Sequence, residues 1–520
     1  MDFLKIQTNP LPFFLAESLN PDSMNRIAAF FAHGKRRFSS VKVDNGTLEN
    51  YHSFNPLVRG TIQQLDSIAP RFALKKGDIE ILNHPVTFYE TLKEKILKAE
   101  KRIFLSSLYI GKHEDELVKV LDDALVKNPN IKLDILVDAL RSTREAPHSD
   151  STASLIAPLV EKHGKHRVNI RLYHTPHLHG WRESITPKRL NEIYGLQHMK
   201  IYGVDDEVIL SGANLSRDYF TNRQDRYYLF KSKDLSNYYH GIQTAVSSLS
   251  YQLITSSRGF FLDWPTDNNA SEPHLNVERF LSDSTRVLVP VLRTKKVETT
   301  TTNEDPDTLV YPVSSFAPLF KDDKSTELPC VLRMLSLLDH KGAKLTMTAG
   351  YFNIHPKIKE RILRGQACSE IITASPEANS FYLSKGISGL LPDAYVYSCE
   401  KFMNEANSSA VKVLEWQNGV VNTPNGWSYH AKGLWVTPPG EDTPAMTVIG
   451  SSNYTRRAYS HDLECNALII TKDDTLRQQM KDEVDNLKKH TSELTMDDFK
   501  ERRRVSPFTK VVANIVSPLL

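Results

Sequence analysis

Two short stretches of the chain carry the same reactive side chains in the same order. Each places a histidine two residues before a lysine, then an apolar run, a turn of small residues, and an asparagine two residues before a hydroxyl side chain. These are His198, Lys200, Asn214 and Ser216 in the first stretch, and His430, Lys432, Asn453 and Thr455 in the second. An acid follows each asparagine at the same interval, Asp225 and Glu464. Recurrence of the whole set indicates an internal duplication.

The residue types suit phosphoryl transfer. Side chains alternate along a strand, so the histidine and lysine of each triplet point to one face. If the stretches meet, two imidazoles and two ammonium groups surround one phosphodiester or pyrophosphate. One imidazole attacks phosphorus while the other protonates the leaving group. The lysines and asparagines would hold the non-bridging oxygens, with Ser216 and Thr455 as further donors, while Asp225 and Glu464 orient the histidines.

The surrounding pattern predicts the elements that position these residues. Short apolar runs alternate with helical patterns in both halves, which predicts an α/β fold with a mostly parallel, helix-covered sheet in each half. Expected strands are 102–110 and 132–140 in the first half and 344–352, 370–375 and 466–471 in the second. Expected helices are 85–99, 114–127, 234–254, 329–339 and 473–490. The charged, threonine-rich stretch 294–308 reads as a linker or insertion.

Bulk properties limit the possibilities. A chain of 520 residues is too long for one ordinary core, so two domains or two fused halves are expected. The net charge of +3 gives no global field of the kind that marks a nucleic-acid binder. Four scattered cysteines favour a reduced protein without a thiolate metal site, and the phosphoryl chemistry requires neither metal nor cofactor. No apolar stretch is long enough for a transmembrane helix.

A targeting signal is expected near the N-terminus. The segment 24–40 has four Lys or Arg residues, no acid and apolar residues at helical spacing, which is typical of a mitochondrial presequence. A solvated basic arm is the alternative. The histidines at 174, 177 and 179 have ligand-like spacing, but they lie in a proline-containing loop without a nearby carboxylate, so a zinc site is not expected.

The repeated motif resembles that of the phospholipase D superfamily, H-x-K-x4-D followed by a turn similar to G-S-x-N. The first copy includes the acid, Asp205, whereas the second has Thr437 at that position, with Glu441 and Asp442 in a nearby insertion. The resemblance implies two αβα-sandwich halves with one shared active site at their interface. It also implies a phosphohistidine intermediate, with His198 as nucleophile and His430 as acid and base. The family acid is largely structural, so its replacement leaves the second His/Lys pair usable.

Within that superfamily, stretches such as F-L-S-S-L-Y-I-G-K and N-G-W-S-Y-H-A-K-G resemble the mitochondrial phosphatidylglycerophosphate synthases, the fungal members above all. The resemblance runs from about residue 78 to 490. It implies CDP-diacylglycerol as donor, CMP as leaving group and glycerol-3-phosphate as acceptor, on the matrix side of the inner mitochondrial membrane. The acceptor's dianion calls for further cations, for which arginine is suited. The candidates are Arg141 and Arg144 first, then Arg456 and Arg457, with Arg223 and Arg226 also available, unless they form structural ion pairs.

These readings predict five segments and a membrane contact. The segments are an N-terminal extension (1–45), a first half (78–262), a linker or insertion (263–308), a second half (309–490) and a C-terminal tail (491–520). The tail has three consecutive arginines, 502–504, before apolar residues at helical spacing, so it could lie in an anionic membrane interface or pack on the core. The loop with Trp181, Lys188 and Arg189 is a second interfacial candidate.

Three other functions use some of the same residues. A phospholipase or nuclease would use both histidines with water as the acceptor. A phosphatidylserine synthase would replace glycerol-3-phosphate with serine. Thr437 motivates the third, a non-catalytic relative that binds lipid or nucleic acid. We expect no nucleic-acid partner, and the sequence leaves the oligomeric state open.

Overall fold

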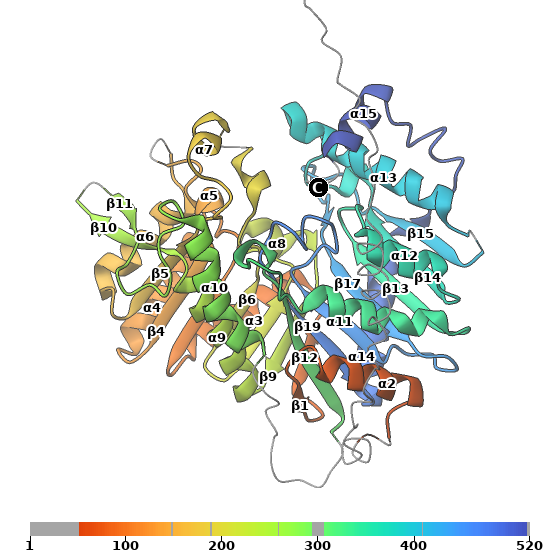
Figure 1. Ribbon diagram of the computed structural model, residues 1–520, viewed down its shortest axis with the longest axis horizontal. Helices are drawn as coiled ribbons and strands as arrows, with labels where there is room; N and C mark the ends of the chain where they lie inside the picture. Colours follow the sequence, from red (N-terminus) through yellow and green to blue (C-terminus); the bar gives the residue numbers. More distant parts are fainter. Residues whose placement is uncertain are drawn as a thin grey trace, which may run out of the picture. The chain divides into compact units, whose positions relative to one another are not determined.

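The computed structural model describes residues 51, 53–146, 149–187, 190–257, 259–293, 306–407 and 409–516. The predicted presequence and most of the stretch 294–308 lie outside these residues. Ser53–Leu520 forms one compact unit, built on two nine-stranded sheets and one two-stranded sheet (Figure 1).

The first sheet has the strand order β11-β10-β5-β4-β3-β6-β7-β9-β2. Its central strands β3, β4 and β5 are parallel, and all its other pairings are antiparallel. The strand bounds are β2 Ile79–Leu82, β3 Arg102–Ser106, β4 Lys132–Asp138, β5 Val168–Tyr173, β6 Ile201–Val204, β7 Glu207–Ser211, β9 Tyr227–Lys231, β10 Tyr251–Ser256 and β11 Gly259–Asp263.

The second sheet has the order β1-β12-β19-β18-β17-β13-β14-β15-β20, again with three parallel strands, β13, β14 and β15. The strand bounds are β1 Phe72–Leu74, β12 Thr308–Ser315, β13 Lys344–Ala349, β14 Cys368–Ala374, β15 Val411–Trp416, β17 Lys432–Thr437, β18 Met446–Gly450, β19 Glu464–Thr471 and β20 Thr491–Glu493. The small third sheet pairs β8 (Arg223–Gln224) with β16 (Ser428–Tyr429).

The two large sheets repeat one topology. The series β5-β4-β3-β6-β7-β9-β2 matches β15-β14-β13-β17-β18-β19-β12 in order and in strand direction. The expected α/β duplication is therefore confirmed. The prediction that each sheet is mostly parallel is wrong, because the motif strands β6 and β17 run antiparallel to β3 and β13 and are followed by further antiparallel strands.

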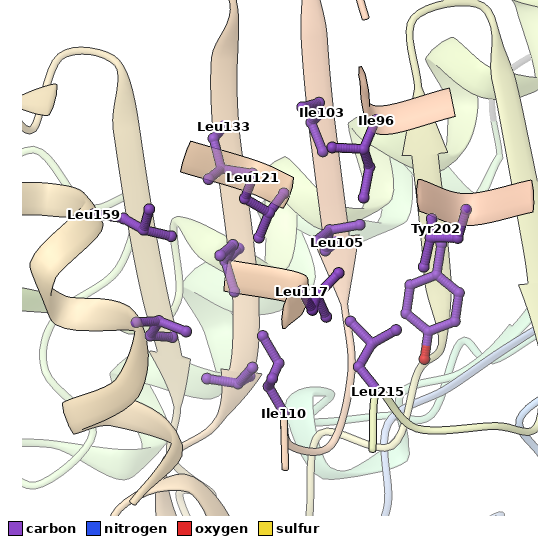
Figure 2. Close-up of a cluster of buried hydrophobic side chains, with 14 of the residues drawn as sticks. Ile96, Ile103, Leu105, Ile110, Leu117, Leu121, Leu133, Leu159, Tyr202 and Leu215 are labelled. Atoms are coloured by element: carbon purple, nitrogen blue, oxygen red, sulfur yellow. The ribbon is translucent and has the colours of Figure 1, made fainter. Parts of the chain in front are cut away.

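Helices cover both faces of the first sheet. Those of the first half are α3 Pro85–Leu97, α4 Asp115–Lys127, α5 Ala139–Ser142, α6 Thr152–His163, α7 Trp181–Ile185, η3 Asn191–Tyr194, α8 Arg217–Thr221, α9 Lys233–Ser247 and α10 Val277–Leu292. A cluster of apolar side chains from α3, α4 and α6 packs on β3 and β4, with Leu105 and Leu133 among its strand members (Figure 2). Burial of such side chains is the main force that holds helix to sheet.

The opposite face of the first sheet packs on α9 and α10 and also on strands of the second half. Phe104, Ile201 and Tyr239 belong to the same buried cluster as Ile449 and Ala467. The core is therefore continuous between the halves. The predicted linker or insertion 263–308 is not simply a linker, because α10 lies within it and buries Phe280 and Leu288 in this cluster.

The remaining elements belong mainly to the second half. They are α2 Pro56–Asp66, η4 Ala317–Leu319, α11 Glu327–Met334, η5 Leu335–Asp339, α12 Pro356–Arg364, η6 Pro376–Ala378, η7 Gly386–Leu390, α13 Leu391–Glu405, α14 Asp474–Lys488 and α15 Pro507–Val516. Strand β1, close to the start of the described chain, pairs with β12 at the edge of the second sheet. Within the described ranges no helix combines the length and apolarity needed to cross a bilayer.

Candidate active site

The two motif histidines occupy equivalent places, directly before β6 and β17. The backbone N–H of His198 donates to the carbonyl of Leu463 at 2.9 Å, and that of His430 donates to the carbonyl of Gln224 at 2.9 Å. Parallel β-bridges accompany both contacts, Gln197 with Leu463 in one case and β16 with β8 in the other. Each histidine segment is thus fixed by backbone pairing to the opposite half.

The acids predicted to orient the histidines do so across the halves. His198 Nδ1 lies 2.9 Å from Glu464 Oε1, and His430 Nδ1 lies 2.7 Å from Asp225 Oδ2. Gly212 leaves room for Asp225, since a Cβ there would lie 2.5 Å from Oδ1 of this carboxylate. With Nδ1–H donating to a carboxylate, Nε2 is the ring nitrogen that can act as base or nucleophile, and that of His430 lies 3.1 Å from Lys432 Nζ.

The motif lysines are buried beside the histidines. Lys200 Nζ donates to the carbonyl of His198 at 2.7 Å, and Lys432 Nζ donates to the carbonyl of His430 at 2.9 Å. Burial, together with the positive charge of the opposite motif's lysine, lowers the pKa of both His198 and Lys200. These mutual effects mean that the two motifs form one electrostatic cluster, as the sequence predicted.

Burial moves the acids and bases of this cluster toward their neutral forms. It lowers the pKa of both histidines well below the ordinary value, with Lys432 adding to the effect at His430. It raises the pKa of Asp225 to about 6 and that of Glu464 to about 7, against the opposing pull of the lysines. The pKa of Lys432 falls to about 8 through burial, although Asp225 partly restores it. A dianionic ligand would favour the protonated imidazole and ammonium forms.

Of the motif asparagines, Asn214 is buried and Asn453 is half-buried, and the amide oxygen of each is itself buried. Asn214 Oδ1 and Asn453 Oδ1 have no hydrogen-bond partner within the described part of the chain. Rotation of such an amide by half a turn presents NH₂ donors at the same position, which suits a phosphoryl oxygen. The Ser216 hydroxyl lies 3.5 Å from that of Tyr109, and Thr455 Oγ1 accepts a hydrogen bond from the backbone of Ala458 at 3.2 Å.

Two tyrosines that the sequence did not indicate flank His430. The Tyr219 hydroxyl is 3.5 Å from His430 Nε2 and accepts a hydrogen bond from Asn214 Nδ2 at 3.1 Å. The rings of Tyr219 and Tyr351 contact the imidazole edge-on, with centroids at 5.2 and 5.6 Å. Tyr219 lies on the short helix α8 just after the first asparagine, a proximity that could have drawn attention to it. Tyr351 follows β13, so only the sheet topology brings it here.

The candidate arginines have different surroundings. Arg144 and Arg457 both bind Glu192, the first through its carboxylate and the second through its carbonyl, and Arg457 Nε is also 2.8 Å from Asp462. Arg141 stacks over the Tyr109 ring at 4.7 Å, close to Ser216. Arg456 is exposed.

The two arginines after Asn214 are buried and held by protein groups. Arg223 Nε donates to Ser428 at 2.8 Å, and Arg226 forms an ion pair with Glu483, with Nε 2.8 Å from Oε1.

Asp205 has a structural environment rather than a place beside the histidines. It lies at the far end of β6, with φ of 51°, and its carboxylate accepts the backbone N–H groups of Glu100, Lys101 and Arg102 at 2.8, 2.8 and 3.0 Å. The motif groups Asp205 with the predicted catalytic residues His198 and Lys200, but its contacts are those of the structural acid that the resemblance implies. Thr437 ends β17 at the matching place, where Asp442 makes only an exposed ion pair with Lys344 at 3.3 Å.

Two other kinds of site have less support in the described structure. Within the described ranges no group of three or more His, Cys, Asp and Glu side chains is placed to hold a metal ion. A cavity of about 930 Å³ lies between α11 and α12, away from the histidines. Two arginines that line this cavity form ion pairs with acids that also line it, since Arg361 lies 3.1 Å from Asp339 and Arg364 lies 2.6 Å from Glu360. The histidine cluster is therefore the stronger candidate for chemistry.

Known proteins resemble this chain over most of its length. The CDP-diacylglycerol–glycerol-3-phosphate 3-phosphatidyltransferase of Saccharomyces cerevisiae is 49% identical over 466 residues, covering 86% of this chain and 89% of the relative. The enzyme of the same name from Schizosaccharomyces pombe is 38% identical, covering 82% and 92%. The human mitochondrial enzyme is 32% identical, covering 88% and 85%.

The fold has a counterpart among solved structures. The crystal structure of phosphatidylserine synthase from Haemophilus influenzae matches with a TM-score of 0.66 and 21% identity, covering 90% of this chain and 100% of that one. This likeness shows that the two proteins share a fold. No protein-family model matches the chain. From the extent and identity of the curated relatives, the chain belongs to the CDP-diacylglycerol–glycerol-3-phosphate 3-phosphatidyltransferase family.

Proposed function

We propose that this chain transfers the phosphatidyl group of CDP-diacylglycerol to glycerol-3-phosphate, releasing CMP and forming phosphatidylglycerol phosphate by way of a phosphohistidine. Family membership supports the substrates. The observation that carries the mechanism is the crossed arrangement of two imidazoles, each with its Nδ1 on a carboxylate of the other half. Such an arrangement supplies one nucleophile and one proton donor to the same phosphorus.

In the first step His198 Nε2 attacks the phosphorus that bears the diacylglycerol. The bond from this phosphorus to the bridging oxygen breaks as the P–N bond forms, and His430 gives its proton to the departing CMP. We assign His198 as nucleophile because the Tyr219 hydroxyl stands near Nε2 of the other histidine, where it can assist proton transfer. Lys200, Lys432 and the two asparagine amides stabilise the charge that develops on the non-bridging oxygens.

In the second step the roles reverse. Neutral His430 removes the proton from the primary hydroxyl of glycerol-3-phosphate, whose oxygen attacks the phosphohistidine and releases His198. The acceptor's phosphate needs a cation outside the two motifs. Arg141 fits this role better than Arg144 or Arg457, because those two guanidinium groups already hold Glu192 and Asp462.

Trapping of the intermediate tests this mechanism. Rapid acid-free quenching of the enzyme with CDP-diacylglycerol labelled at the phosphatidyl phosphorus should leave label on the protein, in an acid-labile and base-stable form. His198→Ala should abolish the label, whereas His430→Ala should slow labelling without removing the attachment site. Label that survives in His198→Ala and disappears in His430→Ala would reverse the two roles.

The products distinguish the competing functions. With glycerol-3-phosphate present the labelled product should be phosphatidylglycerol phosphate, and without it CMP should exchange into CDP-diacylglycerol. Phosphatidic acid as the main product in both cases would indicate a hydrolase. Preferential labelling of serine in a mixture of the two acceptors would indicate a phosphatidylserine synthase.

The cellular setting follows from the same reaction. Relatives that carry the mitochondrial name support a mitochondrial location for this chain. We place it on the matrix side of the inner membrane, bound peripherally to the lipid surface that holds its donor and product. Import and protease-protection of the tagged full chain in isolated mitochondria would check this placement.

A further inference from the structure

Helix α15 has one face on the protein and one face with no partner in the described structure. Thr509 and Ala513 are each 3% exposed, and Lys510 Nζ binds Glu400 of α13 at 2.9 Å. The opposite side carries apolar residues that are mostly exposed. They are Phe508 at 68%, Val511 at 59% and Ile515 at 71%. Their spacing puts them on one side of the helix, so a seated helix presents an apolar stripe outward.

The position of this stripe is fixed by ion pairs in the segment before it. Arg503 binds Glu415 with Nε at 2.8 Å and Nη2 at 2.7 Å, and its Nη1 binds Glu377 at 2.8 Å. Arg502 also binds Glu415, at 2.7 Å. These two arginines therefore attach the tail to the second half. One face of α15 packs on the protein, and the other face is left exposed.

The stripe lies at the end of the sheets that carries the histidines. The histidines precede β6 and β17, which run antiparallel to β3 and β13, so they stand at the carboxyl ends of the parallel strands. The connections that leave these same ends include α7 after β5 and η6, η7 and α13 after β14. Helix α15 packs on α13, and Figure 1 shows α7, α13 and α15 at this end.

Two more apolar side chains are exposed on those connections. Leu383, before η7, is 82% exposed, and Ile185, in α7, is 67% exposed. We call Phe508, Val511, Ile515, Leu383 and Ile185 together the apolar rim. Both halves contribute to the apolar rim, and both also contribute to the histidine cluster.

Cations without an acid in the same segment lie next to the members of the apolar rim from the second half, whereas Ile185 has both Arg182 and Glu183 beside it. Residues 504–516 contain Arg504 and Lys510 but no acid, and residues 378–390 contain Lys385 but no acid. Apolar side chains bordered by cations match the interface of a bilayer with anionic headgroups. A few scattered apolar side chains are too small a surface for a stable protein partner, which needs roughly 800 Å² from each side.

We propose that the apolar rim seats the enzyme on an anionic phospholipid bilayer and so brings a lipid phosphate to the histidine cluster from the membrane side. The inference rests on the proposed function for the identity of the lipid substrate, but the seating itself can be measured without turnover. The stripe on α15 enters the headgroup region, while Lys385 and Arg504 face the lipid phosphates.

Vesicle binding by the full chain tests the proposal. The probes are vesicles of phosphatidylcholine with and without phosphatidylglycerol. The variant Phe508→Ser/Val511→Ser/Ile515→Ser should bind the anionic vesicles at least about tenfold more weakly, because three side chains no longer leave water on binding. The control is Leu97→Ser/Val126→Ser, which changes exposed apolar residues at the C-terminal ends of α3 and α4, at 39% and 61% exposure and at the opposite end of the sheet, and should leave binding unchanged.

Activity on two forms of the donor separates seating from chemistry. The triple variant should lose turnover of vesicle-embedded CDP-diacylglycerol and keep turnover of a short-chain, monomeric analogue, with an unchanged Tm. Full vesicle binding by the triple variant would overturn the proposal. So would a change from dimer to monomer with vesicle binding intact, since the stripe would then be an interface between copies. If the wild type binds vesicles but turns over neither donor form, the proposed function fails while the seating stands.

Discussion

His198 and His430 share one design but have different neighbours. The Nδ1 of each histidine contacts a carboxylate, and the lysine two residues later donates a hydrogen bond to the backbone carbonyl of that histidine. Within the described structure only His430 has tyrosine rings packed against it, and the hydroxyl of Tyr219 lies beside its Nε2. The two copies of the duplicated motif thus have different surroundings, which fits the two different roles proposed for their histidines.

The first half-reaction should have a bell-shaped pH profile. Glu464, with pKa raised to about 7, must be ionised to hold the Nδ1–H of His198, so the single-turnover rate constant for CMP release at sub-saturating donor should rise as pH increases through that region. Lys432, with pKa lowered to about 8, must stay protonated to hold phosphoryl oxygens, so the rate should fall above that pH. Measuring CMP release without acceptor keeps the titration of glycerol-3-phosphate out of the profile.

The variant Lys432→Arg checks the assignment of the alkaline limb. Arginine remains protonated over the whole range, so this limb should move upward or disappear while the acid limb stays in place. The absolute rate should fall, because guanidinium geometry differs from that of the ammonium group. An alkaline limb that is the same in the variant and the wild type would assign it to another group.

A buried ion pair next to β9 links the first half to the second. Arg226 precedes β9, is buried, and meets Glu483 of α14 while its Nη1 donates to the carbonyls of Lys432 at 3.1 Å and Val448 at 2.7 Å. Its guanidinium also stacks over the Trp435 ring at 3.9 Å. Burial alone would lower the pKa of Arg226, but the Glu483 carboxylate outweighs it, so the group stays charged. The arginine thereby positions β17 together with His430 and Lys432 at its start.

Removing this ion pair should unfold the protein at much lower denaturant. Arg226→Ala leaves Glu483 buried and unpaired, which costs about 3–5 kcal/mol, measured by urea unfolding. Gly433→Ala should also destabilise, because a Cβ there would lie 1.9 Å from Arg226 Nη1. The double variant should cost less than the sum, since the two residues share one space.

Lys481→Ala is the matched control on the same helix. Its ion pair with Asp485 is exposed to solvent, so its loss should leave the free energy of unfolding almost unchanged. Equal destabilisation by Arg226→Ala and Lys481→Ala would show that the buried pair does not hold the sheets together.

The two halves of the molecule contact each other at the motif histidines and the acids that bind them. His198 comes from the first half and its carboxylate from the second, while His430 comes from the second half and its carboxylate from the first. The backbone bridges beside each pair are also exchanged in this way. Neither half alone therefore contains an oriented imidazole, and the orientation of both depends on the contact between the halves.

Histidine NMR of the full chain can test this crossing independently of activity. Glu464→Gln should shift the Nδ1–H resonance of His198 and leave that of His430 in place, and Asp225→Asn should do the opposite. The resonances are assigned from their loss in His198→Ala and His430→Ala. If each acid affected only the histidine of its own half, the crossed pairing would be wrong.

Much of this arrangement could be predicted from the order of residue types. The recurrence of histidine, lysine, asparagine and acid predicted the duplication, the single electrostatic cluster, and Asp225 and Glu464 as partners of the histidines. Such patterns are readable because a strand's period-two geometry and a catalytic motif are both local along the chain. The same local reading misjudged the sheets as mostly parallel and did not foresee the burial of α10 within 263–308, because strand direction and the burial of a helix depend on distant partners.

Three features depend on contacts between residues far apart in sequence. Each histidine is paired with an acid of the other half, Tyr351 lies beside His430, and Arg226 is bound by protein groups and so is not free to bind a ligand. A side chain's type states which bonds it can make, but not which partner will reach it. Arg226 could have bound a phosphate, yet a buried carboxylate on α14 occupies it. Folding brings that carboxylate within hydrogen-bond distance, and the cost of leaving either charge buried and alone makes the pairing decisive.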